Sequence, residues 1–296
     1  MTAVPAHGCA WPTIGLTHLT SRPAARARLY CVPPSGAGPY FFQPWVSILP
    51  ETVDLSAADL PGRGARSGEP SITDMRLAAT QLADLIAADL GRDHTSDGFY
   101  ALFGHSFGGL LAFETARRLR RAHDTQPNLL AVSGNPAPHL NGLRRYLVMH
   151  LDAGIGVLAQ AALGALARAA EPADPSLAEE SLLVETVYTP FMADAVALLQ
   201  HTHHDEPPLN ARISVFGAHD DPIAPPESLP GWALHTTTRA HTHLYPGDHQ
   251  YLHATLPAVI TQLTADLLQA LRHEAGDDLD HSGSPCNPGT GSGCQG

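Results

Sequence analysis

One short segment, residues 104–108 (Gly-His-Ser-Phe-Gly), constrains the fold more than any other part of the chain. It has the form Gly-x-Ser-x-Gly, in which a serine stands on a sharp turn between a buried strand and a helix. Residues 99–103 are apolar and aromatic, which predicts the strand, and residues 109–121 repeat apolar side chains at helical spacing before a cluster of arginines. Glycine is expected on both sides because larger side chains collide where the strand turns back. The segment therefore predicts a strand–turn–helix unit that exposes Ser106 as a nucleophile.

Strand and helix patterns alternate along the rest of the chain. Strands are predicted at residues 28–32, 52–55, 99–103, 129–133, 213–217 and 241–245, and helices at 71–90, 109–121 and 256–272. Ser71 or Thr73 is expected to cap the first helix. Alternation of this kind builds βαβ units and predicts an α/β fold with a mostly parallel central sheet flanked by helices. Residues 139–210 show helical patterns and no clear strand, so we expect a helical lid inserted near the carboxyl edge of the sheet.

Length and composition favour a single folded domain with loose ends. A chain of 296 residues, 44% of them hydrophobic, buries a large core without a second domain. Residues 1–26 are polar and aperiodic, so we expect a loose N-terminal arm. The domain is expected at 27–272. Residues 273–296 are rich in Gly, Ser, Pro and Asn, which predicts a disordered tail.

Charge and residue usage exclude several classes of function. The formal net charge of −12 argues against a nucleic-acid partner. All 17 basic residues are arginine, which excludes lysine chemistry such as a Schiff base. No apolar run is long enough to span a membrane, and the first residues lack the pattern of a secretory signal. The sequence therefore predicts a cytoplasmic protein with no membrane partner.

The metal-ligating residue types form no convincing site. The four cysteines match no zinc spacing, and the apolar run around Cys31 predicts a core residue; the others are Cys9, Cys286 and Cys294. His201, His203 and His204 form a run, but no carboxylate completes a ligand pair with them. No metal and no cofactor is predicted.

A serine nucleophile needs a base, and the base needs a carboxylate that orients it. In a sheet of this kind the acid follows the serine along the chain and lies after a later strand. Asp220 and Asp221 both follow the strand at 213–217. Asp221 is preferred because Pro222 fixes the turn that holds its carboxylate.

The base is expected after the last strand, at 241–245. His249 lies in the loop that follows this strand, and its position favours it over His253. His105, inside the glycine-flanked turn, is expected to point away from the catalytic side.

Two backbone N–H groups are expected to stabilise an oxyanion. One belongs to Phe107, directly after the serine, and the other comes from the loop after the first strand. That loop, residues 33–38, begins with two prolines, which have no N–H. Ser35 or Gly36 is therefore expected to donate the second hydrogen bond.

Several further motifs accompany these candidates, at residues 29–33, 41–45, 60–64, 102–108, 133–138, 190–194, 221–222 and 246–249. With them the chain, from about Arg28 to Leu271, resembles the type II thioesterases of nonribosomal peptide and polyketide synthesis, which are α/β-hydrolases. The Pro-Gly-Arg-Gly loop at 61–64 and the Ser-Gly-x-x-Ala-Pro segment at 133–138 are the most specific of them, because general esterases lack both.

The resemblance implies a catalytic triad of Ser106, Asp221 and His249, with oxyanion donors at Phe107 and Ser35. It also implies that the chain hydrolyses acyl groups from the phosphopantetheine arm of an acyl- or peptidyl-carrier protein and so edits a synthase. The alternatives are a small-molecule carboxylesterase or lipase with the same triad, and a non-catalytic binding protein that retains the triad as a relic.

The chain departs from the family pattern at three places. Residues 34–37 read Pro-Ser-Gly-Ala where the family has His-Ala-Gly-Gly, and residues 192–194 read Met-Ala-Asp where it has Arg-Ala-Asp. Gln250 stands where an aromatic residue usually follows the catalytic histidine. Because a carrier protein is acidic, as this chain is, docking is expected to need a basic patch, and Arg144 with Arg145 is the best-placed candidate.

Overall fold

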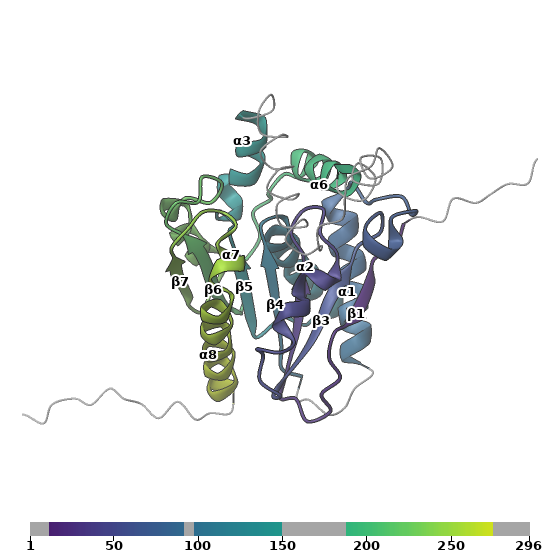
Figure 1. The fold of residues 1–296 in the computed structure, drawn as a ribbon. Coiled ribbons are helices and arrows are strands. Elements are labelled where there is room, and N and C mark those ends of the chain that lie inside the picture. The colour runs from purple at the N-terminus through teal and green to yellow at the C-terminus, as the bar shows by residue number, and fades with distance from the viewer. Residues whose placement is uncertain (1–11, 92–97, 150–187, 275–296) are drawn as a thin grey trace, which may run out of the picture.

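A seven-stranded sheet in the order β1-β3-β2-β4-β5-β6-β7 forms the centre of the protein (Figure 1). The structure is a computed structural model that describes residues 12–91, 98–149 and 188–274. The strands are β1 (Gly15–His18), β2 (Ala27–Val32), β3 (Val53–Asp59), β4 (Tyr100–His105), β5 (Leu129–Ser133), β6 (Arg212–Ala218) and β7 (Ala240–Tyr245). β1 pairs antiparallel with β3, and the other strand pairs are parallel. The predicted sheet is confirmed.

Helices cover both faces of this sheet (Figure 1). On one face, α1 (Met75–Leu90) and α2 (Phe107–His123) bury one apolar cluster against the strands. On the other face, α8 (Leu256–Glu274) and the short helix η1 (Pro39–Trp45) bury a second cluster. Cys31 is buried in this second cluster, as predicted for a core residue.

The remaining described helices are shorter than α1, α2 and α8. They are η2 (Gly64–Arg66), η3 (Pro138–Leu140), α3 (Gly142–Met149), α6 (Thr189–Gln200), η5 (Pro226–Ser228), η6 (Pro230–His235) and α7 (Tyr251–Ala254). Figure 1 shows α3 and α6 next to each other above one end of the sheet. Both belong to the insertion expected at 139–210, of which residues 150–187 lie outside the described residues.

Two sequence predictions about local structure were wrong. The expected loose arm at 1–26 contains β1, whose four residues are half-buried or exposed at the sheet edge and so show no apolar alternation. The cap of α1 is Asp74, not Ser71 or Thr73, because its carboxylate accepts the N–H groups of Arg76 and Leu77 at 2.8 and 3.2 Å. The tail from residue 275 on lies outside the described residues. In the part of the chain that is described, no helix is long and apolar enough to cross a membrane.

Candidate active site

The turn that carries Ser106 is sterically tight. Ser106 has a φ of 54° and a ψ of −122°, which is a strained conformation for a residue with a side chain. A Cβ on Gly104 would lie 2.0 Å from the carbonyl oxygen of Gly108, and a Cβ on Gly108 would lie 2.2 Å from that of Val32. Glycine is therefore required at both positions, and the start of α2 lies directly against the end of β2.

Gly108→Ala is expected to reduce hydrolytic activity by about two orders of magnitude and to lower the melting temperature, because the new methyl group would press on backbone that cannot move aside cheaply. The backbone that would be displaced is that of Val32 and Pro33. The loop that is expected to supply an oxyanion donor begins at these residues. Gly68→Ala is the matched control, since no atom lies within 4 Å of its added Cβ. Steady-state rates and thermal melts of both variants test this, and wild-type activity in Gly108→Ala would contradict it.

A continuous chain of hydrogen bonds links a serine, a histidine and an aspartate from three separate loops. Ser106 Oγ lies 2.9 Å from His249 Nε2, and His249 Nδ1 lies 2.8 Å from Asp221 Oδ2. These residues follow β4, β7 and β6, which run parallel to one another, so the three strands bring them to the same edge of the sheet. The arrangement can activate the serine hydroxyl as a nucleophile.

The carboxylate of Asp221 is buried and fully engaged. Its Oδ1 accepts the N–H groups of Ile223 and Ala224 at 2.8 and 3.0 Å, while Oδ2 faces His249. Burial opposes its negative charge, but the hydrogen bond and charge of His249 and the two N–H groups outweigh burial and hold the pKa of Asp221 below its ordinary value. Asp221 is therefore ionised at neutral pH and oriented to stabilise a cationic imidazole.

The two rival residues lie elsewhere. Asp220 is exposed, and its backbone N–H donates to the carbonyl of Gly247. His253 is also exposed, with its ring 5.6 Å from that of Phe41. Ser106 Oγ instead faces His249 Nε2, at 2.9 Å.

The expectation for His105 was wrong. Its ring is buried, with its centroid 5.1 Å from that of His249, because the loop after β7 folds down onto this side of the sheet. Its Nδ1 lies 2.8 Å from Ser133 Oγ, which lies 2.6 Å from the hydroxyl of Tyr251. Burial, and then the proximity of His249, lower the pKa of His105 to about 3, so a neutral ring packs beside the His249 imidazole.

The sequence did not predict these contacts of His105 with His249 and Ser133. Ser133 and Asn135 lie in the Ser-Gly-x-x-Ala-Pro segment, and that motif was the available signal. Asn135 Nδ2 donates to the backbone carbonyl of Ser106 at 2.6 Å, and the backbone carbonyl of Asn135 accepts from Trp232 Nε1 at 2.9 Å. The motif thus holds the serine turn through Asn135 and the His105 ring through Ser133.

The oxyanion candidates differ in how far their N–H groups are occupied. Phe107 is the first residue of α2, and its N–H has no acceptor among the described residues. Gly36 donates its N–H to Asp194 Oδ2 at 2.8 Å. The N–H of Ser35, by contrast, has no acceptor within the described ranges. Of the two loop candidates, Ser35 therefore keeps its donor.

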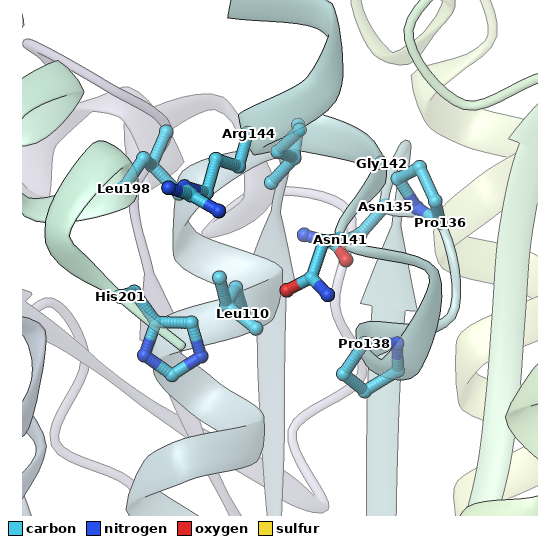
Figure 2. Close-up of a pocket in the computed structure, with 10 residues that line it drawn as sticks. Leu110, Asn135, Pro136, Pro138, Asn141, Gly142, Arg144, Leu198 and His201 are labelled. Carbon is cyan, nitrogen blue, oxygen red and sulfur yellow. The ribbon is translucent and has the colours of Figure 1, made fainter. Parts of the chain in front are cut away.

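A small cavity beside the serine turn shows how closely the insertion packs on the domain. Its volume is about 20 Å³, and Figure 2 shows Leu110 of α2, Asn135 after β5, Arg144 of α3 and Leu198 of α6 converging on it. This space accommodates about one water molecule and not an acyl chain. The cavity is therefore a packing feature between α2, α3 and α6.

The histidine run after α6 lies against cationic side chains. Burial, and then the nearby Arg117, lower the pKa of His201 to about 4, and the same two causes lower that of His203. Among the described residues, no group of three or more His, Cys, Asp or Glu side chains is arranged to hold a metal ion.

Comparison with known proteins decides the family. The model of the Thioesterase domain family matches residues 27–267. The chain belongs to this family. The thioesterase is 28% identical to thioesterase PikA5 of Streptomyces venezuelae over 246 residues, which cover 83% of each chain.

Two solved structures extend the comparison. The thioesterase RedJ from the prodiginine pathway of Streptomyces coelicolor is 31% identical, with a TM-score of 0.64 over 88% of this chain and 90% of that one. The type II thioesterase BorB from the borrelidin biosynthetic cluster is 26% identical, with a TM-score of 0.68 over 85% and 97% of the two chains. The predicted α/β-hydrolase fold and the resemblance to type II thioesterases are confirmed, and the protein is a hydrolase.

Proposed function

We propose that this thioesterase removes acyl groups from the phosphopantetheine arm of a carrier protein, with Ser106 as the nucleophile, His249 as the base and Asp221 as the orienting acid. The observation that carries the proposal is the unbroken hydrogen-bond chain from Ser106 Oγ to Asp221 Oδ2. The membership of the thioesterase family and the likeness to type II thioesterases of biosynthetic clusters support the carrier-bound thioester as substrate.

In the first half of the reaction, Ser106 Oγ attacks the thioester carbonyl while His249 Nε2 accepts the hydroxyl proton. The carbonyl oxygen becomes an oxyanion, which the N–H groups of Phe107 and Ser35 stabilise. The tetrahedral intermediate collapses, the C–S bond breaks, and His249 returns the proton to the pantetheine sulfur. The products are an acyl-serine and the free thiol of the carrier arm.

In the second half, His249 takes a proton from a water molecule that attacks the acyl-serine. The C–O bond to Ser106 then breaks, the proton returns to Ser106 Oγ, and the carboxylic acid leaves. Asp221 stabilises the imidazolium in both halves and keeps Nδ1 protonated. Such a reaction clears stalled or incorrect acyl groups from a synthase, an editing role, and we place it in the cytoplasm with the synthase.

The test compares the same acyl group in two kinds of bond. Acyl-carrier thioesters and matched oxygen esters are supplied at equal concentration, and kcat/KM is measured for each. A kcat/KM at least tenfold higher for the carrier thioester is expected. Equal or faster hydrolysis of the oxygen ester would favour a small-molecule carboxylesterase on the same triad.

We further propose that α3 contributes to carrier docking. Arg144 and Arg145 are exposed on this helix, and Val148 and Met149 at its end are 55% and 73% exposed. An acidic partner with an apolar patch complements such a surface, whereas Arg120 and Arg121 in the cluster at the end of α2 pair with Glu206.

Replacing Arg144 and Arg145 together by alanine is expected to raise KM for acyl-carrier substrates about five- to tenfold at low salt, because two rim charges are lost. KM for free acyl-pantetheine is expected to stay unchanged, since that substrate lacks the carrier. Arg239→Ala is the matched control, because this exposed arginine lies just before β7, at the amino end of the strand. Unchanged carrier KM in the double variant would remove α3 from the docking surface.

A further inference from the structure

One buried carboxylate joins three segments that are far apart in the sequence. Asp194, on α6, receives two hydrogen bonds from the Arg63 guanidinium, Nη1 to Oδ2 at 2.7 Å and Nη2 to Oδ1 at 2.8 Å. Its Oδ2 also accepts the backbone N–H of Gly36 at 2.8 Å. The two side chains are 1% and 0% exposed. Asp194 therefore ties α6 and the Pro-Gly-Arg-Gly loop to the loop that follows β2.

The Pro-Gly-Arg-Gly loop is shaped to deliver this guanidinium. Gly62 and Gly64 have φ values of +81° and +55°, so the backbone bends into the left-handed region on both sides of Arg63. A Cβ on Gly62 would also lie 2.0 Å from Ser71 Oγ. The two glycines thus allow the sharp turns that send the Arg63 side chain into the interior.

A buried ion pair is a costly way to hold segments together. Desolvation of two charges offsets most of their attraction, and apolar residues of similar volume often stabilise a fold equally well. What the pair provides here is a fixed acceptor, because a bidentate contact holds both carboxylate oxygens in one orientation. Oδ2 is thereby aimed at the Gly36 N–H, a contact that apolar side chains cannot make.

The hydrogen bond from Gly36 to Asp194 also affects the neighbouring peptide group, which carries the Ser35 N–H. Gly36 has a φ of +76°, and the N–H of Ala37 donates to the carbonyl of Pro34, so the loop makes a tight turn at this point. With the Gly36 N–H taken by Asp194, the orientation of the preceding Ser35 peptide is set as well. We propose that Asp194, held by Arg63, is a positioning residue that orients the Ser35 N–H toward the oxyanion. This inference rests on the proposed acyl transfer at Ser106.

The test uses two double variants that differ in a single acceptor. Arg63→Met with Asp194→Asn removes both charges and keeps an oxygen for Gly36, whereas Arg63→Met with Asp194→Leu removes the charges and the oxygen at nearly the same side-chain shape. The leucine variant is expected to have a kcat about 10- to 100-fold below the asparagine variant, with KM within about threefold, because loss of one oxyanion donor costs a factor of this order or more.

Two ligands separate positioning from a general structural role. An acyl-pantetheine trifluoromethyl ketone forms an anionic adduct with the serine and needs the oxyanion donors, whereas the thioether analogue, with a methylene in place of the carbonyl, does not. Affinity for the ketone is expected to fall in parallel with kcat, while affinity for the thioether stays unchanged. Equal kcat in the two double variants, or an equal loss of affinity for both ligands, would overturn the proposal.

Labelling of Ser106 by a fluorophosphonate distinguishes a failure of the proposed acyl transfer from a failure of the positioning role alone. If the wild-type protein is not labelled, the proposed acyl transfer itself fails. If it is labelled and the two double variants are equally active, only the positioning role fails. Should either double variant not fold, Arg63→Lys takes their place, since it keeps the charge and loses the bidentate contact. A lower kcat with parallel loss of ketone affinity is then expected, and wild-type values would overturn the inference.

Discussion

Ser106→Ala is expected to lower the rate of hydrolysis of acyl-carrier thioesters by at least about a thousandfold, because the three triad residues act together and loss of one disables the others. The hydroxyl lies 2.9 Å from the imidazole that would accept its proton, and alanine leaves nothing to attack the carbonyl. Fold stability is expected to change little, since alanine adopts the strained backbone of this position as readily as serine. Release of the free thiol and labelling by a fluorophosphonate measure the effect, and labelling is expected to vanish.

Ser35→Ala is the matched control for this variant. It also deletes a serine hydroxyl beside the site, but it keeps the backbone N–H that we assign to the oxyanion. Its kcat is expected to stay within about threefold of the wild type. Turnover of Ser106→Ala within tenfold of the wild type would remove Ser106 as the nucleophile, and a large loss in Ser35→Ala would move the role of Ser35 from its backbone to its side chain.

The serine turn could be predicted from sequence because the pattern that marks it is local, even though one of its glycines is required by a contact with β2. The glycines at 104 and 108 are required by contacts between the ends of two strands and one helix, and the strand and helix on either side carry clear periodic patterns. The short strand β1 had no such pattern. Its side chains are half-buried or exposed, so neither alternation nor a continuous apolar run marks it.

The contacts that sequence reasoning missed are long-range. Arg63 and Asp194 were both part of recognised motifs, but they are 131 residues apart and nothing local pairs them. His105 was misplaced for a related reason. β4 is buried along its whole length, so burial does not distinguish its two faces, and the packing of His249 on one of them depends on a loop 143 residues beyond Ser106.

A large loss of activity is also expected when the orienting carboxylate is replaced. Asp221→Asn is expected to lower kcat by about a thousandfold or more, because the base would be held in the wrong tautomer. The oxygen of the new amide would stay with the N–H groups of Ile223 and Ala224, which need an acceptor. Its NH₂ group would then face His249 Nδ1, which has to accept, so the proton would move to Nε2 and block uptake of the proton of Ser106.

Asp220→Asn is the control for Asp221→Asn, since it makes the same chemical change one residue away on an exposed side chain. Its kcat is expected to stay within twofold of the wild type. Asp221→Asn is also expected to lose stability at neutral pH, because the carboxylate of Asp221 has a lowered pKa in the folded protein and so stabilises the fold above its ordinary pKa. This contribution of the wild type disappears as the pH falls through the lowered pKa, so the stabilities of the two proteins should converge in acid. A large loss of kcat in Asp220→Asn, with Asp221→Asn fully active, would reverse the assignment of the acid. Two equally active variants would mean that His249 needs no carboxylate to act as a base.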